Sequence, residues 1–239
     1  MADSLFIVIP AYNEGSNIRS VLNEWYSVCK DLEKNGAICR IIVANDGSTD
    51  NTFFKLKSLA EKIPILEVID KDNSGHGATI YYLYRYALES KADYIFQTDS
   101  DGQTVPVELF PFWEQRRGYD LIIGNRNKRE DGIGRVFVTN VLKVVLFFIF
   151  GVWIKDANSP FRLMKSDALK QIIKPIPPDF ALTNAAICAV AAKMNKTILW
   201  DPITFKSRQG GKNSINYKRI VTIGLKALSG FRKVNKTIL

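Results

Sequence analysis

The chain has 239 residues, which suits one large α/β domain or two small ones. Hydrophobic residues make up 46% and charged residues 24%, a balance that excludes wholesale disorder. The formal net charge of +9 fits an anionic partner, such as a nucleic acid, a membrane surface or a phosphorylated substrate, without choosing among them.

Short β-branched apolar runs alternate with segments of helical periodicity through the first half of the chain. Residues 5–9 predict a buried strand that Pro10 closes, and residues 17–34 carry apolar side chains at helical spacing. The same patterns predict further strands at residues 40–44, 65–69, 94–98 and 121–124, with helices at about residues 54–59 and 77–89. The alternation predicts an α/β fold with a mostly parallel, Rossmann-like central sheet flanked by helices.

The second half of the chain is less regular. Residues 136–154 are apolar over a length that would suit a membrane span, but Asn140 and Lys143 interrupt them, so we favour a buried or interfacial helix. A helix is predicted at residues 183–194 and a strand at 197–200. Residues 217–236 mix apolar and basic side chains, which predicts a basic amphipathic helix.

The cysteines and the N-terminus indicate a reduced, cytosolic protein. Cys29, Cys39 and Cys188 are odd in number, and their spacing resembles neither a zinc site nor a redox pair. The first apolar run follows no basic region and ends in a polar turn, so we interpret it as a strand and not as a signal peptide.

Polar clusters follow three of the predicted strands directly. Residues 12–14 (Tyr-Asn-Glu), 45–48 (Asn-Asp-Gly-Ser) and 98–103 (Thr-Asp-Ser-Asp-Gly-Gln) each begin where a strand ends. In parallel sheets, ligands bind outside the carboxyl ends of the strands. We therefore expect the three clusters to share one site.

The third cluster has the composition of a metal site. Asp99 and Asp101 are two residues apart and can converge on one hard cation, and the amide oxygen of Gln103 could add a neutral ligand. Mg²⁺ and Mn²⁺ prefer oxygen ligands and keep positions open for substrate phosphates. The alternative is a solvated acidic turn, because Asp, Ser and Gly are common turn residues.

The order and spacing of these motifs resemble the family 2 glycosyltransferases, which have the GT-A fold. The resemblance covers about the first 130 residues and includes the loop at residues 73–78 with Gly75. It implies that Pro10, Tyr12 and Glu14 line the nucleotide, that Asp46 holds the base edge, and that Asp99 and Asp101 act at the sugar and the metal. The alternatives are that Pro10 only ends a strand, that Tyr12 only packs and that Asp46 only stabilises its turn.

Four further segments resemble the branch that contains dolichyl-phosphate mannose synthase and bacterial polyprenyl-phosphate glycosyltransferases. They are Gln103 after the Asp pair, Gly124-Asn125-Arg126 with Arg135 beyond it, residues 156–162 and residues 205–214. The third resembles a D-x-x-S-G-F-R segment with Pro160 in place of glycine, and the fourth an F-x-x-R-x-x-G-x-S element that ends at Ser214.

The resemblance gives the basic residues two roles. The metal and Arg208 or Lys212 would neutralise the departing nucleoside diphosphate, while Arg126, Arg135 and Arg162 would hold an acceptor phosphate through bidentate hydrogen bonds. The alternative for each is a surface charge.

The acceptor is inferred from a missing carboxylate. Family members that glycosylate a hydroxyl place an Asp near the start of a late helix as a general base, and Asn184 aligns there, with Asp179 close by. An acceptor phosphate needs no base, because its second pKa is about 6. His76, the sole histidine, lies in a glycine-flanked loop, where a structural role is at least as plausible as a catalytic one.

These patterns predict an inverting glycosyltransferase with Mg²⁺ or Mn²⁺ as cofactor, a UDP or GDP sugar as donor and polyprenyl phosphate as acceptor. Residues 1–215 would form the catalytic domain, with the donor site in 1–130 and the acceptor site in 131–215, followed by the basic helix. We expect a cytoplasmic enzyme at the inner face of the membrane, and no nucleic acid partner, because the basic residues form no recognisable nucleic-acid module. Transfer to a saccharide or glycolipid hydroxyl, and a non-catalytic relative, are the alternatives.

Overall fold

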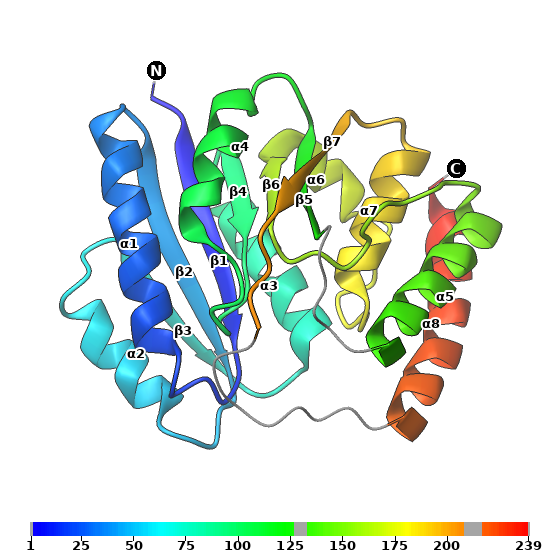
Figure 1. Cartoon of the computed structure of the whole chain (residues 1–239), viewed down its shortest axis with the longest axis horizontal. Helices are drawn as coiled ribbons and strands as arrows, with labels where there is room; N and C mark the ends of the chain where they lie inside the picture. Colours follow the sequence, from blue (N-terminus) through cyan, green and yellow to red (C-terminus); the bar gives the residue numbers. More distant parts are fainter. Residues whose placement is uncertain (1, 127–132, 208–216, 239) are drawn as a thin grey trace.

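The computed structural model describes residues 2–126, 133–207 and 217–238, and in these residues it forms one seven-stranded sheet in the order β3-β2-β1-β4-β6-β5-β7 (Figure 1). The strands, in chain order, are β1 (Ser4–Ala11), β2 (Ile38–Asp46), β3 (Leu66–Lys71), β4 (Tyr94–Gln97), β5 (Leu121–Arg126), β6 (Arg162–Lys165) and β7 (Ile198–Ile203). All neighbouring pairs are parallel except the two that β6 makes with β4 and β5. The predicted α/β fold with a mostly parallel sheet is confirmed.

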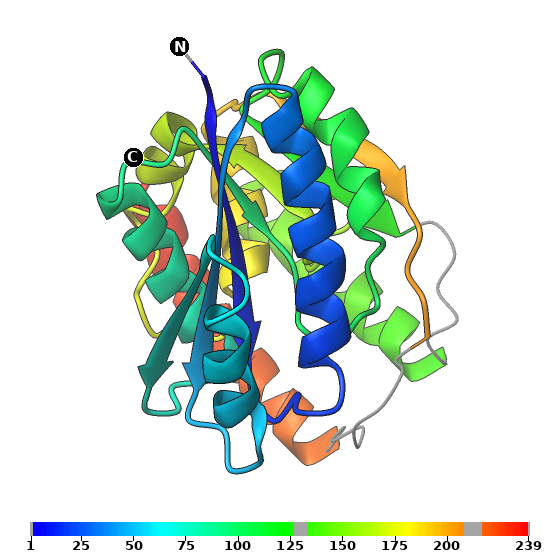
Figure 2. The same cartoon turned by 90° about the vertical axis from the view of Figure 1, so that its left-hand side faces the viewer.

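Helices cover both faces of the sheet, as Figures 1 and 2 show from two sides. They are α1 (Ile18–Lys34), α2 (Thr52–Ala60), α3 (His76–Glu89), α4 (Leu109–Gln115), α5 (Ile133–Phe150), α6 (Ser166–Ile172), α7 (Thr183–Lys193) and α8 (Tyr217–Thr237). A single 3₁₀ turn, Pro106–Glu108, precedes α4 in the part of the chain that the structure describes.

Two apolar cores lie on opposite faces of the sheet because side chains alternate along each strand. In β1, Leu5, Ile7 and Ile9 pack on the side of α1, α2 and α4, whereas Phe6 and Val8 pack on the side of α3 and α7. The first core uses the helical stripe that the sequence predicted in α1, and the second also takes in buried side chains of α5, α6 and α8. Both faces of the central strands are therefore buried, as in other sheets with helical crossovers.

Several details of the fold differ from the sequence prediction, which did not include the short helices α4 and α6. Pro10 does not end the first strand but lies within β1, opposite Ala44 of β2. The antiparallel strand β6 was not predicted, because its four residues are too short for a period to be read. The apolar helix α5 begins at Ile133 and ends at Phe150, so residues 151–154 lie outside it. Among the described residues, no helix has the length and hydropathy to cross a bilayer.

The topology brings the predicted loops to one edge of the sheet. The parallel strands β2, β1 and β4 are neighbours, so residues 12–14, 45–48 and 98–103 lie at the same edge, with Asn45 and Asp46 as the last two residues of β2. Since β6 runs antiparallel to β4, its first residue, Arg162, lies opposite Gln97 at that edge. The expectation that one sheet edge holds the polar clusters is confirmed.

Candidate active site

Asn13 ties the loop after β1 to the loop after β2. Its backbone adopts a left-handed conformation, with a φ of 55°, which Asn tolerates better than most residues. Its N–H donates to Ser48 Oγ at 3.0 Å, and its side-chain oxygen accepts from the N–H of Thr49 at 2.8 Å. The two loops are thereby held as one unit before any ligand binds.

The residues predicted to line the nucleotide differ in their accessibility. Tyr12 is 48% exposed and can contact a ligand. Glu14 is buried, and its carboxylate accepts from the amide of Asn17 at 2.9 Å, at the start of α1. The carbonyl oxygen of Pro10 accepts from Ser100 Oγ at 2.9 Å, which joins β1 to the loop after β4. In this structure Glu14 and Pro10 therefore position the site, and Tyr12 faces solvent.

Both carboxylate oxygens of Asp46 accept hydrogen bonds from the loop after β3. Its Oδ1 accepts from Lys71 Nζ at 2.5 Å and from the N–H of Ser74 at 2.9 Å, and its Oδ2 accepts from the N–H of Gly75 at 2.9 Å. Burial alone would raise the pKa of Asp46, but the hydrogen bonds from Lys71, Ser74 and Thr79 and the charge of Lys71 outweigh it and lower that pKa. Asp46 thus fixes the loop between β3 and α3.

Gly75 and Gly77 allow this loop to approach its neighbours. Gly75 has a φ of 87°, a conformation that other residues rarely adopt, and this turns its N–H toward Asp46. A Cβ on Gly77 would lie 2.3 Å from the carbonyl oxygen of Phe180, so only glycine fits against that turn. The start of α3 therefore packs directly on the segment that leads into α7.

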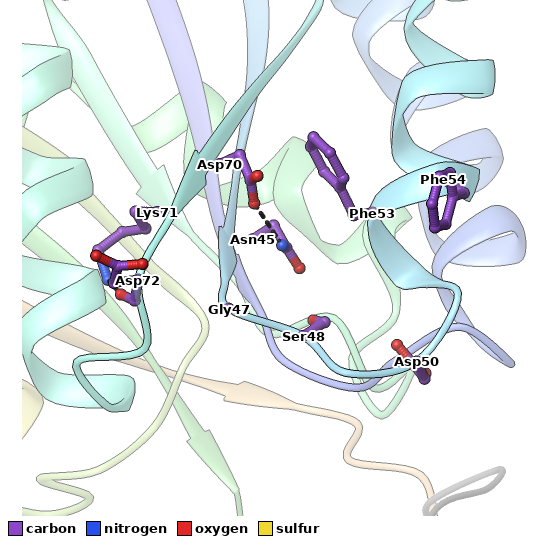
Figure 3. Close-up of a pocket in the computed structure, with 9 residues that line it drawn as sticks. All are labelled: Asn45, Gly47, Ser48, Asp50, Phe53, Phe54, Asp70, Lys71 and Asp72. Atoms are coloured by element: carbon purple, nitrogen blue, oxygen red, sulfur yellow. Dashed lines mark hydrogen bonds between the residues drawn. The ribbon is translucent and has the colours of Figure 1, made fainter.

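A cavity of about 460 Å³ opens beside this loop, between β2, β3 and the start of α2 (Figure 3). Asn45 donates to Asp70 across it at 2.7 Å. Its lining residues are Asn45, Gly47, Ser48, Asp50, Phe53, Phe54, Asp70, Lys71 and Asp72. Neither Tyr12 nor Asp46 lines it, but Lys71, which does, donates to Asp46, so the cavity adjoins the predicted base site.

Asp99 carries an unpartnered carboxylate oxygen. Its Oδ1 is buried, and none of the described residues donates a hydrogen bond to it. The Nε2 atom of His76 lies 3.9 Å from it, which is too far for a hydrogen bond. A buried oxygen without a donor is costly unless a ligand or a cation satisfies it, so Asp99 has the character of a binding group.

Asp101 and Gln103 complete the predicted metal triplet. Asp101 Oδ1 accepts from the backbone N–H of Gln103 at 3.1 Å. The side-chain amide of Gln103 donates to the carbonyl of Lys206 at 2.8 Å, which fixes its orientation. Thr104 and Phe205 form an isolated bridge alongside. The segment after β7 is thus attached to the acidic loop.

The donor set fits a hard divalent cation. Carboxylate and amide oxygens are what Mg²⁺ and Mn²⁺ prefer, and the unpartnered Asp99 Oδ1 offers an oxygen that no described donor uses. The described residues contain no group of three or more His, Cys, Asp or Glu side chains that could hold a metal ion by themselves. A cation at Asp99 and Asp101 would therefore need oxygens from a substrate diphosphate as well.

Arg126 is held by a carboxylate that the sequence analysis had not selected as a site residue. Its Nε donates to Asp156 Oδ2 at 2.7 Å and its Nη2 to Oδ1 at 2.8 Å, and both side chains are largely buried. The guanidinium also lies over the ring of Phe205, 4.9 Å from its centroid. Because Asp156 occupies one edge of the fork, a phosphate would meet only the other edge.

The prediction that Arg162 contacts an acceptor phosphate is corrected by its burial. Arg162 is 0% exposed, and its Nε donates to the carbonyl of Ser159 at 3.0 Å, its Nη1 to that of Asn184 at 3.1 Å and its Nη2 to that of Ala157 at 3.4 Å. With every guanidinium nitrogen bonded inside the protein, Arg162 joins β6 to the start of α7 instead of binding a ligand.

Asn184 aligns with the general base of the family, and Asp179 is the carboxylate close to it in the sequence. Asn184 is buried in the first turn of α7, and no described group donates to its Oδ1. Asp179 is exposed in the turn before α7. The position that the sequence assigned to Asn184 thus belongs to the polar interior around Arg162.

The remaining predicted residues are basic or lie in the last loop. Arg135 lies in the first turn of α5. Arg208, Lys212 and Ser214 lie outside the described residues.

Sequence reasoning missed two groups that organise this edge, Lys71 and Asp156. Lys71 is the last residue of β3 and pairs in register with Asp46, so the rule applied to the other strand ends would have found it. Asp156 was visible as part of a short motif, but only the folded chain shows that it faces Arg126.

The comparisons with known proteins identify the family to which the chain belongs. Residues 6–175 match the family model for glycosyl transferase family 2. The chain is 27% identical to the UDP-N-acetylglucosamine–dolichyl-phosphate N-acetylglucosaminyltransferase of Methanococcus voltae, over 71% of this chain and 73% of that protein. It is 25% identical to the undecaprenyl-phosphate 4-deoxy-4-formamido-L-arabinose transferase of Pseudomonas paraeruginosa, over 72% of this chain, and spans about half the length of that relative (50%).

Solved structures share the fold at low sequence identity. Glucosyl-3-phosphoglycerate synthase from Mycobacterium tuberculosis, in complex with Mn²⁺, UDP and its product, superimposes with a TM-score of 0.67 at 17% identity. The match covers 98% of this chain and 80% of that one. Together with the family match over most of the chain, this shows that the protein is a GT-A-fold glycosyltransferase and belongs to glycosyltransferase family 2.

Proposed function

We propose that the protein is an inverting, metal-dependent glycosyltransferase that moves a sugar from a UDP or GDP sugar to a polyprenyl phosphate. The observation that carries this proposal is Asp99, whose buried Oδ1 has no donor among the described residues at the sheet edge where Asp46 and Asp101 also lie. In a family 2 chain, such an oxygen is suited to a cation that also binds the donor diphosphate.

Asp99, Asp101 and Gln103 would hold the cation. Bound there, Mg²⁺ or Mn²⁺ would supply positive charge for the departing nucleoside diphosphate. The Mn²⁺ and UDP in the glucosyl-3-phosphoglycerate synthase complex support a divalent cation and a nucleotide donor. Tyr12 would stack on the base, and Asp46 would keep the loops that surround it in place.

The acceptor assignment rests on the start of α7 and on the relatives. Asn184 cannot remove a proton from a hydroxyl, whereas a phosphate monoester, with a second pKa of about 6, is already largely ionised at neutral pH. An oxygen of that phosphate would attack the anomeric carbon as the bond to the diphosphate breaks on the opposite face. The names of the two polyprenyl-phosphate transferases among the relatives support this acceptor.

The basic residues of the second half would bind the acceptor. The free edge of Arg126, with Arg135, would contact the phosphate, and Arg208 and Lys212 would compensate charge on the donor diphosphate. Ser214 lies in the same closing segment. This assignment gives residues 1–130 the donor and residues 131–215 the acceptor, and a lipid-linked acceptor would place the enzyme at the cytoplasmic face of a membrane.

The test is a transfer assay with the purified chain, Mg²⁺ or Mn²⁺, and a panel of UDP and GDP sugars. Undecaprenyl phosphate and dolichyl phosphate in detergent are compared with saccharide acceptors. A thermal-shift panel first selects the donor, because at one concentration the ligand with the lower Kd stabilises the native state more.

The expected product is an acid-labile lipid-phosphate sugar that forms only in the presence of the cation. Transfer to saccharide hydroxyls alone would overturn the polyprenyl phosphate assignment and favour the alternative acceptor. Transfer that is unaffected by chelation of the cation would overturn the metal assignment.

A further inference from the structure

The net charge of the protein is concentrated in two segments. Residues 133–155 and 217–239 contain nine basic residues and no acidic residue, and the remaining positions hold 24 of the 33 basic residues against all 24 acidic ones. The rest of the chain is therefore formally neutral, and the whole charge of +9 belongs to α5, the residues just after it, and α8. The basic residues in question are Arg135, Lys143, Lys155, Lys218, Arg219, Lys226, Arg232, Lys233 and Lys236.

The two segments lie side by side in the folded protein. The ring centroids of Phe150 and Phe231 are 5.9 Å apart, and the side-chain amide of Asn235 donates to the carbonyl of Ile149 at 2.8 Å. In Figure 1, α5 and α8 run together at one end of the molecule, and both begin on the side at which the parallel strands end. Two segments that are far apart in the sequence, and that together carry the excess basic charge, thus lie together at one end of the fold.

The outer face of α5 is apolar and exposed. Val141, Val144 and Phe148 follow one another at helical spacing and are exposed, and Phe148 reaches 79%. Phe147 contacts both Phe148 and Trp153, with ring centroids 5.7 and 6.1 Å apart, and Trp153 is 66% exposed. A continuous apolar patch of this kind marks an interaction site.

We propose that this surface docks on a bilayer of anionic phospholipid, with Phe147, Phe148 and Trp153 inserted between the lipids. Aromatic side chains, tryptophan above all, favour the membrane interface, and basic side chains beside them are attracted to anionic headgroups. Lys143 and Lys155 flank the apolar patch in the sequence, and Arg232, Lys233 and Lys236 are exposed on α8.

A second copy of the chain could also cover this surface, but the charge opposes such a dimer. Two such faces would bring +18 of like charge together without an acidic residue to offset it, which opposes self-association. The docking does not depend on the proposed acceptor, although it names the surface at which a lipid-linked acceptor would be taken up.

The first experiment measures sedimentation of the whole chain with vesicles of phosphatidylcholine, with or without 30% phosphatidylglycerol, at two salt concentrations. We expect binding to the anionic vesicles, weaker binding at high salt, and little binding to the neutral ones. The double variant Phe148→Ser/Trp153→Ser should bind at least about 10-fold more weakly. Phe54→Ser is the matched control, because Phe54 is 74% exposed on α2, away from this surface.

A second pair of variants separates local charge from total charge. Arg232→Gln/Lys233→Gln/Lys236→Gln should lower the affinity for anionic vesicles by about 5-fold for each charge removed. Lys62→Gln/Lys91→Gln/Lys174→Gln removes the same net charge from exposed positions elsewhere and should have a much smaller effect. Equal losses in the two triple variants would overturn the proposed surface.

Three outcomes decide the proposal. The proposal is supported if the Phe148→Ser/Trp153→Ser variant loses vesicle binding but still transfers sugar to a detergent-solubilised acceptor. Unchanged vesicle binding in that variant overturns it, and so does a dimer in sedimentation velocity that the same variant dissociates. If vesicles bind normally but no lipid phosphate is glycosylated, the proposed function fails and the docking surface stands.

Discussion

Asp46 ends β2 and Asp99 follows β4, on either side of β1 and at the same edge of the sheet, yet their carboxylates differ in how many hydrogen bonds they accept from the protein. Both oxygens of Asp46 are occupied by Lys71, Ser74 and Gly75, whereas one buried oxygen of Asp99 has no donor among the described residues. Asp46 is therefore hydrogen-bonded within the protein, whereas Asp99 retains an oxygen that can bind a ligand.

This difference indicates that Asp46 positions the loops of the site and that Asp99 is suited to bind a ligand. A saturated carboxylate stabilises a loop and contributes to the free energy of unfolding, while an unsatisfied one costs stability and serves a ligand that is not part of the chain. Arg162 and Arg126 repeat the contrast on a smaller scale. Arg162 is enclosed on every nitrogen, and Arg126 is engaged along one edge by Asp156.

The largest expected effect is on turnover, in the variants Asp99→Asn and Asp101→Asn. Loss of either carboxylate should lower kcat/KM by about 10²–10³-fold, the range measured when one preorganised electrostatic group is removed. The free energy of unfolding of Asp99→Asn should stay within about 0.5 kcal/mol of the parent, because Oδ1 loses no protein partner. Steady-state kinetics and urea unfolding measure both, with Asp31→Asn on the surface of α1 as the control.

The next largest effect is on stability, in Arg162→Met. This change leaves the carbonyls of Ser159 and Asn184 without their donor in the interior and should cost on the order of 3 kcal/mol. Arg162→Lys should not restore stability, because one ammonium cannot span the same carbonyls. The exposed Arg85→Met is the control, with a change below about 0.5 kcal/mol. If Arg162→Lys is as stable as the parent but binds the acceptor more weakly, the structural role is contradicted and Arg162 contacts the acceptor.

Asp46→Asn should have an intermediate effect that depends on pH. At pH 7 we expect a loss of about 1–3 kcal/mol, because Lys71 loses its charged partner. Since the folded-state pKa of Asp46 lies below its ordinary value, the parent's extra stability is complete above that ordinary value and is lost as the pH falls through the folded-state pKa. The difference between parent and variant in urea unfolding should therefore shrink toward acid pH. A difference that stays constant down to pH 3 would contradict the assignment.

The smallest effect is expected for Ser100→Ala. Its hydroxyl joins the acidic loop to the carbonyl of Pro10, and removing one such hydrogen bond costs about 1 kcal/mol. The exposed Ser20→Ala should be neutral within error. Because Ser100 lies between Asp99 and Asp101, a loss of turnover as large as that of Asp99→Asn would show that the loop position, and not the carboxylate charge, limits the reaction.

Much of the fold was predictable because its signals are local. Apolar runs of β-branched residues and the helical stripe of α1 repeat over enough residues to be recognised, and parallel neighbours then place their following loops at one edge. β6 was missed because its four residues carry no readable period. Pro10 was predicted to end a strand and instead lies within one.

The sequence by itself determined the alternation of strands and helices, the mostly parallel sheet and the edge at which the loops of Tyr12, Asp46 and Asp99 lie, because periodicity is a local property of the chain. Only the tertiary structure decided which of the charged residues are already satisfied. The sequence suggested the same role for Arg162 and Arg126. In the structure, backbone carbonyls surround Arg162, whereas Asp156 binds one edge of Arg126. Asp156 lies 30 residues beyond Arg126 and Asn184 lies 22 beyond Arg162, and burial and hydrogen bonding exist only once the chain has folded.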